Sequence, residues 1–428
     1  MVCVFAFFKS KPKSHGFRYE KWPKSARGVF NRGEKALLGS HAAVCARLVS
    51  YKEVICLITG DSGRMVELLW LIGFCGEFPS QLAERIGGHP DWNRHVKYEA
   101  IKKGYVTVYR EESHQRVIRS LRLTDKGLDY IGSRDPKALA YLWGKANSAN
   151  AGHGGIDKTL RLHALATALV MAYNAGAVFL PDRKPSLLRS TTPDSIKLDP
   201  RKPYFYSSQE LRQAIQEQGD DESLRTVPKT ARLLGVIVQG EWCYLLYHTG
   251  NSRMFWLKGV EENTVAAIQS TLLSRGVNVR IFSQVIIGNR MSVAEKLMKT
   301  DRTGKSKYFT LSTDYNNCFF VTNDSRGDKL LSVIVNPSEQ LKVSRRALSP
   351  FIPPPQGTRT YDALTRDRQH PVILGYTCDL LQLGTIQPYM DGFRYGPVIL
   401  CYDYQADTIQ SIVGPQVEIR IMEGGVTQ

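Results

Sequence analysis

Three side chains within one short stretch are of the types that proteins use to bind DNA. Asn93, Arg94 and Lys97 would face outward on a helix whose inward side is apolar. That inward stripe would consist of Trp92, Val96 and Ala100. The sequence therefore predicts that Gly88–Lys103 contains a helix that enters the major groove. Arg94 and Lys97 would lie nearest to bases or phosphates, and Asn93 is the candidate for adenine.

A hairpin after this helix carries further groups that could hold the DNA backbone. Tyr105–Arg110 and Arg116–Leu123 are typical of strands and flank a polar turn. Arg110, His114 and Arg116 lie in or beside this turn. We expect these three side chains to bind the flanking phosphates.

The elements around these residues follow the order of a winged helix-turn-helix, which we place at residues 61–135. An apolar run, Met65–Phe74, predicts a first helix, and a short amphipathic helix is expected over Ser80–Ile86. Pro90 suits the first position of the DNA-contacting helix, where its missing N–H costs nothing. Thr124 is expected to cap a closing helix. Because helical bundles with hairpins also dock proteins, a protein-docking adaptor is an alternative.

The composition favours a polyanionic partner. The 428 residues include 57 Lys and Arg against 40 Asp and Glu, which gives a net charge of +17. Nine of the cations lie between Lys9 and Lys35, interleaved with aromatic residues. Such a segment could be an arm that adds phosphate contacts. We assign residues 1–60 to this basic arm and an N-terminal segment of no predicted fold.

The cysteines and the apolar runs indicate in which cellular compartment the protein is expected. The eight cysteines are scattered without a C-x-x-C pair, so neither a disulfide framework nor a zinc site is expected, and a reducing cytoplasm is favoured. No apolar run approaches the roughly 18 residues of a membrane span, so no membrane partner is expected. The phosphate-binding pattern G-x-G-x-x-G is absent, and we expect no cofactor.

The rest of the chain alternates between strand-like and helical patterns. We expect a hinge over Arg134–Gly155, an α/β domain at 156–345 and a β-rich C-terminal part at 359–428. The predicted fold class is therefore mixed α+β. His163, on the first helix of the α/β domain, is expected to be a hydrogen-bonded core residue. Predicted helices are Ile156–Gly176, Ser208–Gln218, Glu261–Arg275 and Ser292–Thr300, and predicted strands are Leu233–Gln239, Trp242–Tyr247, Met254–Leu257, Val279–Ile287, Tyr308–Leu311 and Cys318–Thr322.

Two further patterns are typical of phosphate chemistry but are incomplete. Gly304-Lys305-Ser306 resembles the end of a phosphate-binding loop, yet Lys299 occupies the position of the earlier glycine. Pro193-Asp194 precedes the α/β region, as in metal-dependent nucleases of the PD-(D/E)xK type, which also need an acid and a lysine on a following strand. Glu241 begins such a strand, but Cys243 stands where the lysine would be. A nuclease or nicking accessory with a degenerate domain of this kind is an alternative.

Several longer stretches occur in a defined order. They are AIKKGYVTVYR at 100–110, RSLRLTDKGLDYI at 119–131, RLHALATALVMAYNAGA at 161–177, FYSSQELRQA at 205–214 and GVIVQGEWCYLLYHTG at 235–250. Together they resemble the replication-relaxation proteins of Gram-positive plasmids and integrative or conjugative elements, over residues 64–300. The resemblance implies winged-helix DNA binding linked to plasmid replication, mobilisation or element regulation. The chain departs from the commoner family form in lacking an acidic strand motif with a downstream lysine.

These features predict a cytoplasmic, non-enzymatic protein of a mobile genetic element that binds double-stranded DNA. The α/β domain is expected to form a homodimer or to dock a partner protein such as a relaxase or a replication initiator. A homodimer would recognise a pseudo-palindrome with half-sites about one helical turn apart, or a multiple of that.

Overall fold

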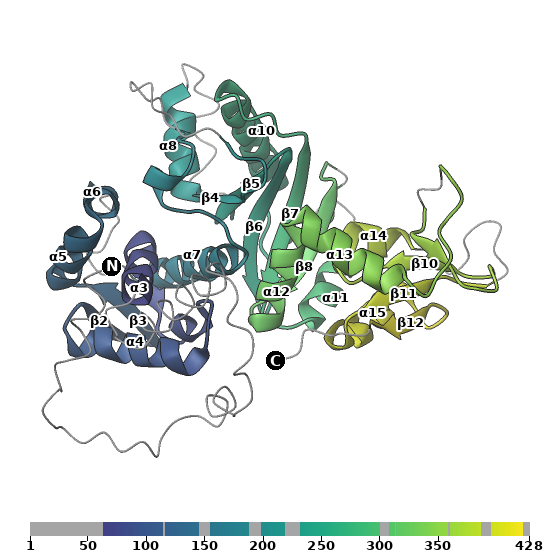
Figure 1. Cartoon of the computed structure of the whole chain (residues 1–428), viewed down its shortest axis with the longest axis horizontal. Helices are drawn as coiled ribbons and strands as arrows, with labels where there is room; N and C mark the ends of the chain where they lie inside the picture. The colour runs from purple at the N-terminus through teal and green to yellow at the C-terminus, as the bar shows by residue number, and fades with distance from the viewer. Residues whose placement is uncertain are drawn as a thin grey trace, which may run out of the picture. The chain divides into compact units, whose positions relative to one another are not determined.

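The computed structural model describes most of the chain after residue 62 (Figure 1). The described residues belong to one compact unit, Gly60–Gln428, and their strands form sheets of three, four and five strands. A mixed fold of helices and several sheets is thus confirmed. The predicted basic arm lies outside the described residues. Those residues are 63–113, 116–144, 155–187, 198–218, 232–299, 308–312, 314–357, 360–386 and 395–422.

The first group of elements packs helices against a small antiparallel sheet of order β1-β3-β2. Its members are α3 (Gly63–Cys75), β1 (Phe78–Pro79), the 3-10 helix η4 (Leu82–Arg85), α4 (Pro90–Lys102), β2 (Val106–Ser113), β3 (Arg116–Leu123) and α5 (Asp125–Arg134). Leu69 and Ile72 of α3 are fully buried. Thr124 caps α5 as predicted, because its Oγ1 accepts a hydrogen bond from the Gly127 N–H at 3.1 Å. The predicted second helix is reduced to the single turn of η4.

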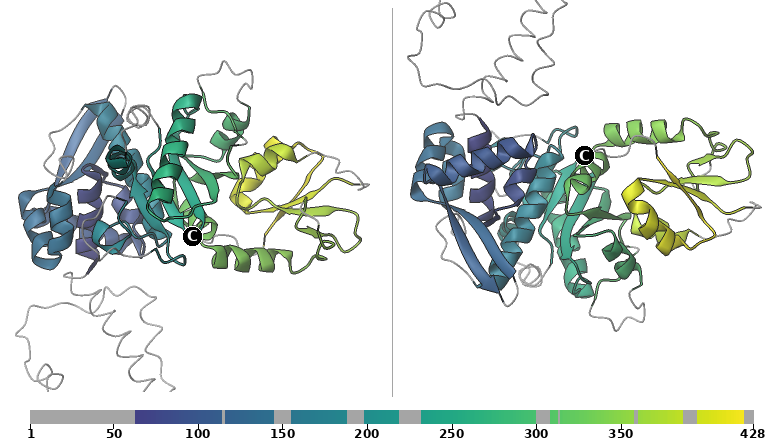
Figure 2. Two further views of the ribbon diagram at one scale, coloured as in Figure 1. Left: turned by 90° about the horizontal axis from the view of Figure 1, so that it is seen from above. Right: turned by 90° about the horizontal axis from the view of Figure 1, so that it is seen from below.

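Two helices connect this group to the rest of the chain. They are α6 (Pro136–Gly144) and α7 (Ile156–Asn174). The prediction of a hinge was wrong for α6, where Ala138 and Leu142 are buried. α7 contacts α3 and β1 on one side and α12 (Ser325–Ile334) and the central sheet on the other. It therefore lies between the N-terminal helices and that sheet (Figure 2).

The central sheet has five strands in sequential order, β4-β5-β6-β7-β8. The strands are β4 (Tyr204–Ser207), β5 (Gly235–Gln239), β6 (Trp242–Gly250), β7 (Ile281–Gly288) and β8 (Asn317–Thr322), and the intervening helices are α8 (Ser208–Gln218), α10 (Lys258–Ser274) and α11 (Ser292–Met298). β4, β5 and β6 pair antiparallel, whereas β6, β7 and β8 pair parallel. The predicted strands Met254–Leu257 and Tyr308–Leu311 were wrong, since they share only an isolated bridge between Phe255 and Tyr308.

The C-terminal part is an α/β arrangement, which corrects the prediction of a β-rich part. Its elements are α13 (Pro337–Leu348), β9 (Ala363–Leu364), β10 (Pro371–Leu374), α14 (Leu380–Thr385), β11 (Val398–Cys401), α15 (Ala406–Val413) and β12 (Glu418–Ile421). β10, β11 and β12 are parallel, and α14 and α15 connect them. The segment before α14 covers the last central strand: the Cys318 N–H donates to Asp379 at 2.9 Å, and the Phe320 N–H donates to the Cys378 carbonyl at 3.0 Å.

Two negative observations hold for the part of the chain that the structure describes. None of its helices combines the length and apolarity needed to cross a lipid bilayer. Its cysteines are unpaired and buried. They are Cys75, Cys243, Cys318, Cys378 and Cys401.

The contact between α7 and the N-terminal sheet contains a histidine that is hydrogen-bonded, as predicted. His163 Nε2 lies 2.8 Å from Ser120 Oγ, and burial lowers the pKa of His163 to about 4. Glu77, which raises that pKa slightly, is itself buried and accepts a hydrogen bond from Thr159 at 2.8 Å. The neutral imidazole is therefore part of the packed interface.

We expect acid to destabilise the protein partly through His163. The folded state holds this histidine neutral down to about pH 4, whereas the unfolded chain protonates it near 6.5. The stability that the neutral ring contributes is thus present above about pH 6.5 and declines as the pH falls towards 4. Urea unfolding midpoints at about pH 7 and about pH 5 measure this loss. His163→Gln should lose less stability between the two pH values than the unaltered protein, and an equal loss would contradict the assignment.

Candidate nucleic-acid interface

The exposed face of α4 carries cationic and aromatic side chains. The helix buries Asn93, Val96 and Ala100 against the elements around it. Its exposed stripe consists of Arg94, His95, Tyr98 and Lys102, which follow one another at helical spacing. The Arg94 and Lys102 side chains keep 58% and 65% of their surface exposed, and Tyr98 keeps 61%. This stripe could contact DNA.

The predicted orientation of Asn93 was wrong. Only 3% of Asn93 is exposed, and its amide donates a hydrogen bond to the Ile86 carbonyl. This bond joins the turn after η4 to the first turn of α4. Asn93 therefore holds the two helices together in this structure, and it does not reach a base.

Lys97 also serves the packing between η4 and α4. Its side chain is only 15% exposed, and its Nζ lies 2.8 Å from Glu84 Oε1 and 3.2 Å from the Ser80 carbonyl. Arg94 reaches Glu84 at 3.1 Å and Asp91 at 2.9 Å. Hydrogen bonds from Lys97 and Arg94 lower the pKa of Glu84, so this carboxylate stays ionised between them. Of the three residues predicted on this helix, Arg94 alone remains well exposed.

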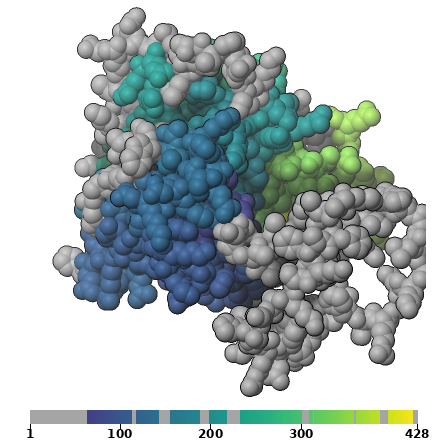
Figure 3. All heavy atoms as spheres, turned by 60° about the vertical axis from the view of Figure 1, so that its left-hand side comes forward, coloured from purple at the N-terminus to yellow at the C-terminus, as the bar shows by residue number. Residues whose placement is uncertain are grey.

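The β2–β3 hairpin places two arginines opposite each other. Arg110 pairs with Arg119 in the antiparallel register, and both are exposed. Glu112 lies 3.0 Å from Arg110, in a contact where both side chains are more than half exposed. Sequence reasoning missed Arg119, because strands that end at Arg110 and begin at Arg116 would pair these two residues, whereas the observed hairpin extends to Ser113 and pairs Arg110 with Arg119. Figure 3 shows this group of elements, coloured blue, on the near face of the molecule.

The remaining residues predicted for the hairpin are only partly described. His114 lies outside the described residues. The backbone of Arg116 pairs with Ser113 at the end of the hairpin, and its side chain is not described. Their predicted contacts with phosphates therefore stay predictions.

A buried polar cluster fixes the turn between η4 and α4 to the central part of the fold. The Arg85 guanidinium lies 2.6 Å from Asp328 of α12, and it also contacts Asn323. Asn174, at the end of α7, donates to the Arg85 carbonyl at 2.8 Å and to Asp328 at 3.1 Å. Its Oδ1 accepts a hydrogen bond from the Gly87 N–H at 2.8 Å. The orientation of α4 is thereby tied to two distant elements.

Most of the residues that suggested other chemistry belong to segments that the structure does not describe. Pro193-Asp194 and Gly304-Lys305-Ser306 lie outside the described residues. Glu241 is 55% exposed and lies 3.6 Å from Arg280. Among the described residues, no group of three or more His, Cys, Asp or Glu could hold a metal ion.

Comparison with known proteins found no match. Neither a protein-family model, nor a curated protein, nor a solved structure matches the chain.

Proposed function

We propose that residues 63–134 form a winged helix-turn-helix that binds double-stranded DNA. In this proposal α4 enters the major groove with Arg94, His95, Tyr98 and Lys102, and the β2–β3 hairpin is the wing that lies on the neighbouring backbone. The observation that carries the proposal is the pair formed by Arg110 and Arg119, both exposed on the hairpin that follows α4. Like charges directly opposite each other destabilise a hairpin, so a phosphate that bridges them would relieve the repulsion.

The assigned roles follow from exposure and charge. Arg94 and Lys102 would approach bases or phosphates, and Tyr98 would supply an apolar contact with a thymine methyl or a sugar. Asn93 and Lys97 would act only by holding η4 and α4 at the angle that presents the stripe. Most affinity would come from phosphate contacts and would depend on salt.

The wider role follows from the sequence resemblance. We place the protein with the replication-relaxation proteins, as a non-enzymatic factor in plasmid replication, mobilisation or regulation of a mobile element. The central and C-terminal parts would then pair two copies or dock a relaxase or a replication initiator. A homodimer would bind a pseudo-palindromic site.

The test is duplex binding by the full chain, measured by fluorescence anisotropy on a labelled random-sequence duplex at several salt concentrations. Arg110→Glu/Arg119→Glu is expected to weaken binding at least about tenfold, because the variant replaces two phosphate ligands by like charges. The dependence of log affinity on log salt should become shallower by roughly 0.9 for each phosphate contact that is lost.

A matched control separates the wing from the net charge. Lys258→Glu/Lys299→Glu makes the same change in net charge on α10 and just after α11, where both lysines are exposed and paired with neighbouring acids. This control should bind duplex as the unaltered protein does. Equal weakening of both variants, or no duplex binding by the unaltered protein, would overturn the proposal and favour the adaptor reading of this unit.

A further inference from the structure

A cationic cavity lies in the C-terminal part, away from the elements assigned to duplex binding. It is a cavity of about 720 Å³ between the end of α13, the Thr365–His370 turn and strand β12. Arg346, Arg366 and Arg420 line it together with His370, and Asp367 is the acidic side chain among the lining residues. Its volume lies within the roughly 300–1,000 Å³ of small-ligand sites. Nothing assigned above to DNA binding uses these residues.

The charges in this cavity favour an anion. No described residue forms an ion pair or a side-chain hydrogen bond with the guanidinium of Arg346. Within the described part of the chain, Arg366 donates a hydrogen bond through Nε to the Pro350 carbonyl at 3.3 Å, and its terminal nitrogens make no hydrogen bond there. Arg420 pairs with Glu418 at 2.6 Å, but both side chains are nearly half exposed, so this pair contributes little and can exchange.

Asp367 is ionised and offsets only one of the three arginine charges, so the lining of the cavity remains cationic. Its carboxylate accepts hydrogen bonds from the Thr365 hydroxyl and from the Gln369 N–H at 3.0 Å, and these bonds lower the pKa of Asp367. The same turn holds Arg368 at a φ of 59°, in the left-handed region that a non-glycine residue rarely adopts. The turn thus places Arg366 among the residues that line the cavity.

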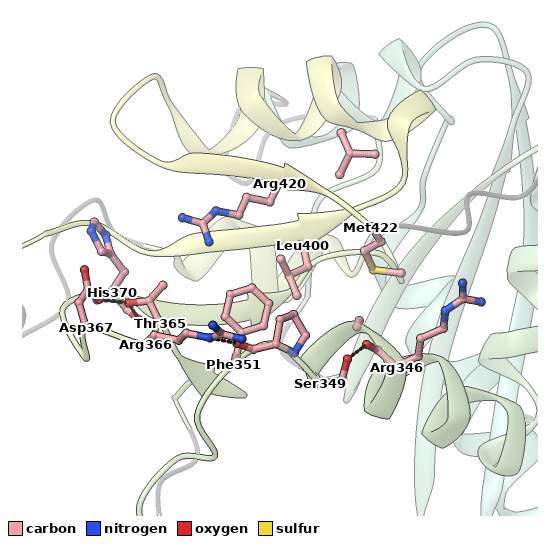
Figure 4. A pocket seen from close by; sticks show the side chains of 13 residues that line it. Arg346, Ser349, Phe351, Thr365, Arg366, Asp367, His370, Leu400, Arg420 and Met422 are labelled. Atoms are coloured by element: carbon pink, nitrogen blue, oxygen red, sulfur yellow. Dashed lines mark hydrogen bonds between the residues drawn. The ribbon is translucent and has the colours of Figure 1, made fainter.

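The cavity also has an apolar surface between its cationic ends. Figure 4 shows Phe351, Leu400 and Met422 lying between Arg366 and Arg420 at one end and Arg346 at the other. Phe351 is half-buried beside Pro350. A ligand that fits this surface carries negative charge next to a flat or apolar group, and nucleotides combine the two.

We infer that this cavity binds a nucleotidyl group. The phosphate would be held by Arg366 and Arg420, and the base would lie against Phe351. Arg346 would receive a neighbouring phosphate when the ligand is part of a strand. A free nucleotide and an unpaired DNA strand share this chemistry, whereas the bases of a duplex are paired and stacked and cannot reach Phe351.

The inference is tested on the full chain with three probes: thymidine monophosphate, a labelled oligothymidylate of eight nucleotides, and a duplex of the same length. Arg366→Ala/Arg420→Ala is expected to weaken binding of the monophosphate, of the oligothymidylate, or of both, by at least tenfold. Phe351→Leu keeps an apolar side chain but removes the aromatic face, and it should weaken the same probe several-fold without changing the salt dependence. Lys342→Ala is the matched control, since Lys342 is 70% exposed on α13 and does not line the cavity.

The outcomes separate the ligand sources and the two sites. Loss confined to the monophosphate identifies a free nucleotide, and loss confined to the oligothymidylate identifies an unpaired strand. The inference is overturned if neither probe binds, if the double variant binds both as before, or if Phe351→Leu leaves both unchanged. Unfolding midpoints of the variants equal to that of the unaltered protein exclude misfolding. Because these variants leave the β2–β3 hairpin unchanged, their binding of duplex tests the proposed function separately.

Discussion

Replacing Glu210 by alanine is expected to lower the free energy of unfolding by about 3–5 kcal/mol, because it would leave the Lys184 ammonium buried without its carboxylate. Lys184 Nζ lies 2.7 Å from Glu210 Oε1 and 2.7 Å from the Phe205 carbonyl. Only 2% of the Lys184 side chain is exposed, and the Tyr206 ring covers it. Burial lowers the pKa of Lys184 even with Glu210 present, which shows how unfavourable this site is for a lone charge.

The measurement is urea unfolding of the alanine variant beside the double variant Lys184→Met/Glu210→Leu. The double variant replaces both charges by apolar side chains of similar volume and should recover the part of the loss that comes from the unpaired ammonium. It does not restore the acceptor of the Ser207 N–H and hydroxyl, which both donate to Glu210. The single variant should also gain stability as the pH rises towards the ordinary pKa of lysine, because the folded state then releases the proton more easily than the unfolded chain. Equal unfolding midpoints for the single and double variants would contradict this account.

Asp328→Ala is expected to lower the free energy of unfolding by about 3 kcal/mol. This value is at the lower end for a broken buried ion pair, because Arg85 keeps 20% of its side chain exposed. The variant removes the ion-pair partner of the Arg85 guanidinium and one acceptor of Asn174, so the turn before α4 is held to α12 less firmly. Duplex binding should weaken together with stability, since the position of α4 then depends on the remaining bonds to Asn174 and Asn323. Urea unfolding and anisotropy measure the two effects.

Two companion variants define what the Asp328 pair contributes. Burial raises the pKa of Asp328, so a neutral amide is tolerated better than a methyl group, and Asp328→Asn should lose less stability than Asp328→Ala. Glu262→Ala breaks an exposed pair with Lys258, at 3.3 Å, and should change stability by no more than about 1 kcal/mol. A loss for Asp328→Ala as small as that for Glu262→Ala would show that the cluster anchors nothing.

Local signals in the sequence were sufficient for many elements of the fold. Pro90 and Asp91 marked the start of α4, and Thr124 marked the start of α5. The range of α8, Ser208–Gln218, was predicted to the residue. These signals depend on capping and hydrogen bonding within a few residues, so they need no knowledge of tertiary contacts.

The face of α4 was harder to predict. A stripe of residues spaced four apart drifts around a helix of 3.6 residues per turn, so Trp92 is only partly buried at the edge of the packed face and Asn93 lies within it. Asn93 is tolerated there only because the Ile86 carbonyl accepts its hydrogen bond. Sequence alone does not show which carbonyl will lie near the Asn93 side chain. The sequence therefore suggested that Asn93 contacts a base, whereas its amide takes part in the packing between η4 and α4.

The C-terminal part was misjudged for a similar reason. α14 and α15 have six and eight residues, too few to give a clear helical period. The cationic cavity was also missed, because Arg346, Arg366 and Arg420 come from three separate segments. Only the parallel pairing of β11 with β12 brings the last of them to the cavity.

The bonds from Cys318 and Phe320 to the segment before α14 bear on how the chain could be divided. A fragment that ended before residue 360 would leave the amide groups of β8 without the acceptors at Cys378 and Asp379. An uncovered parallel strand of apolar residues is a template for pairing between molecules. The C-terminal part thus protects the edge of the central sheet, and a fragment that ends with that sheet is expected to aggregate.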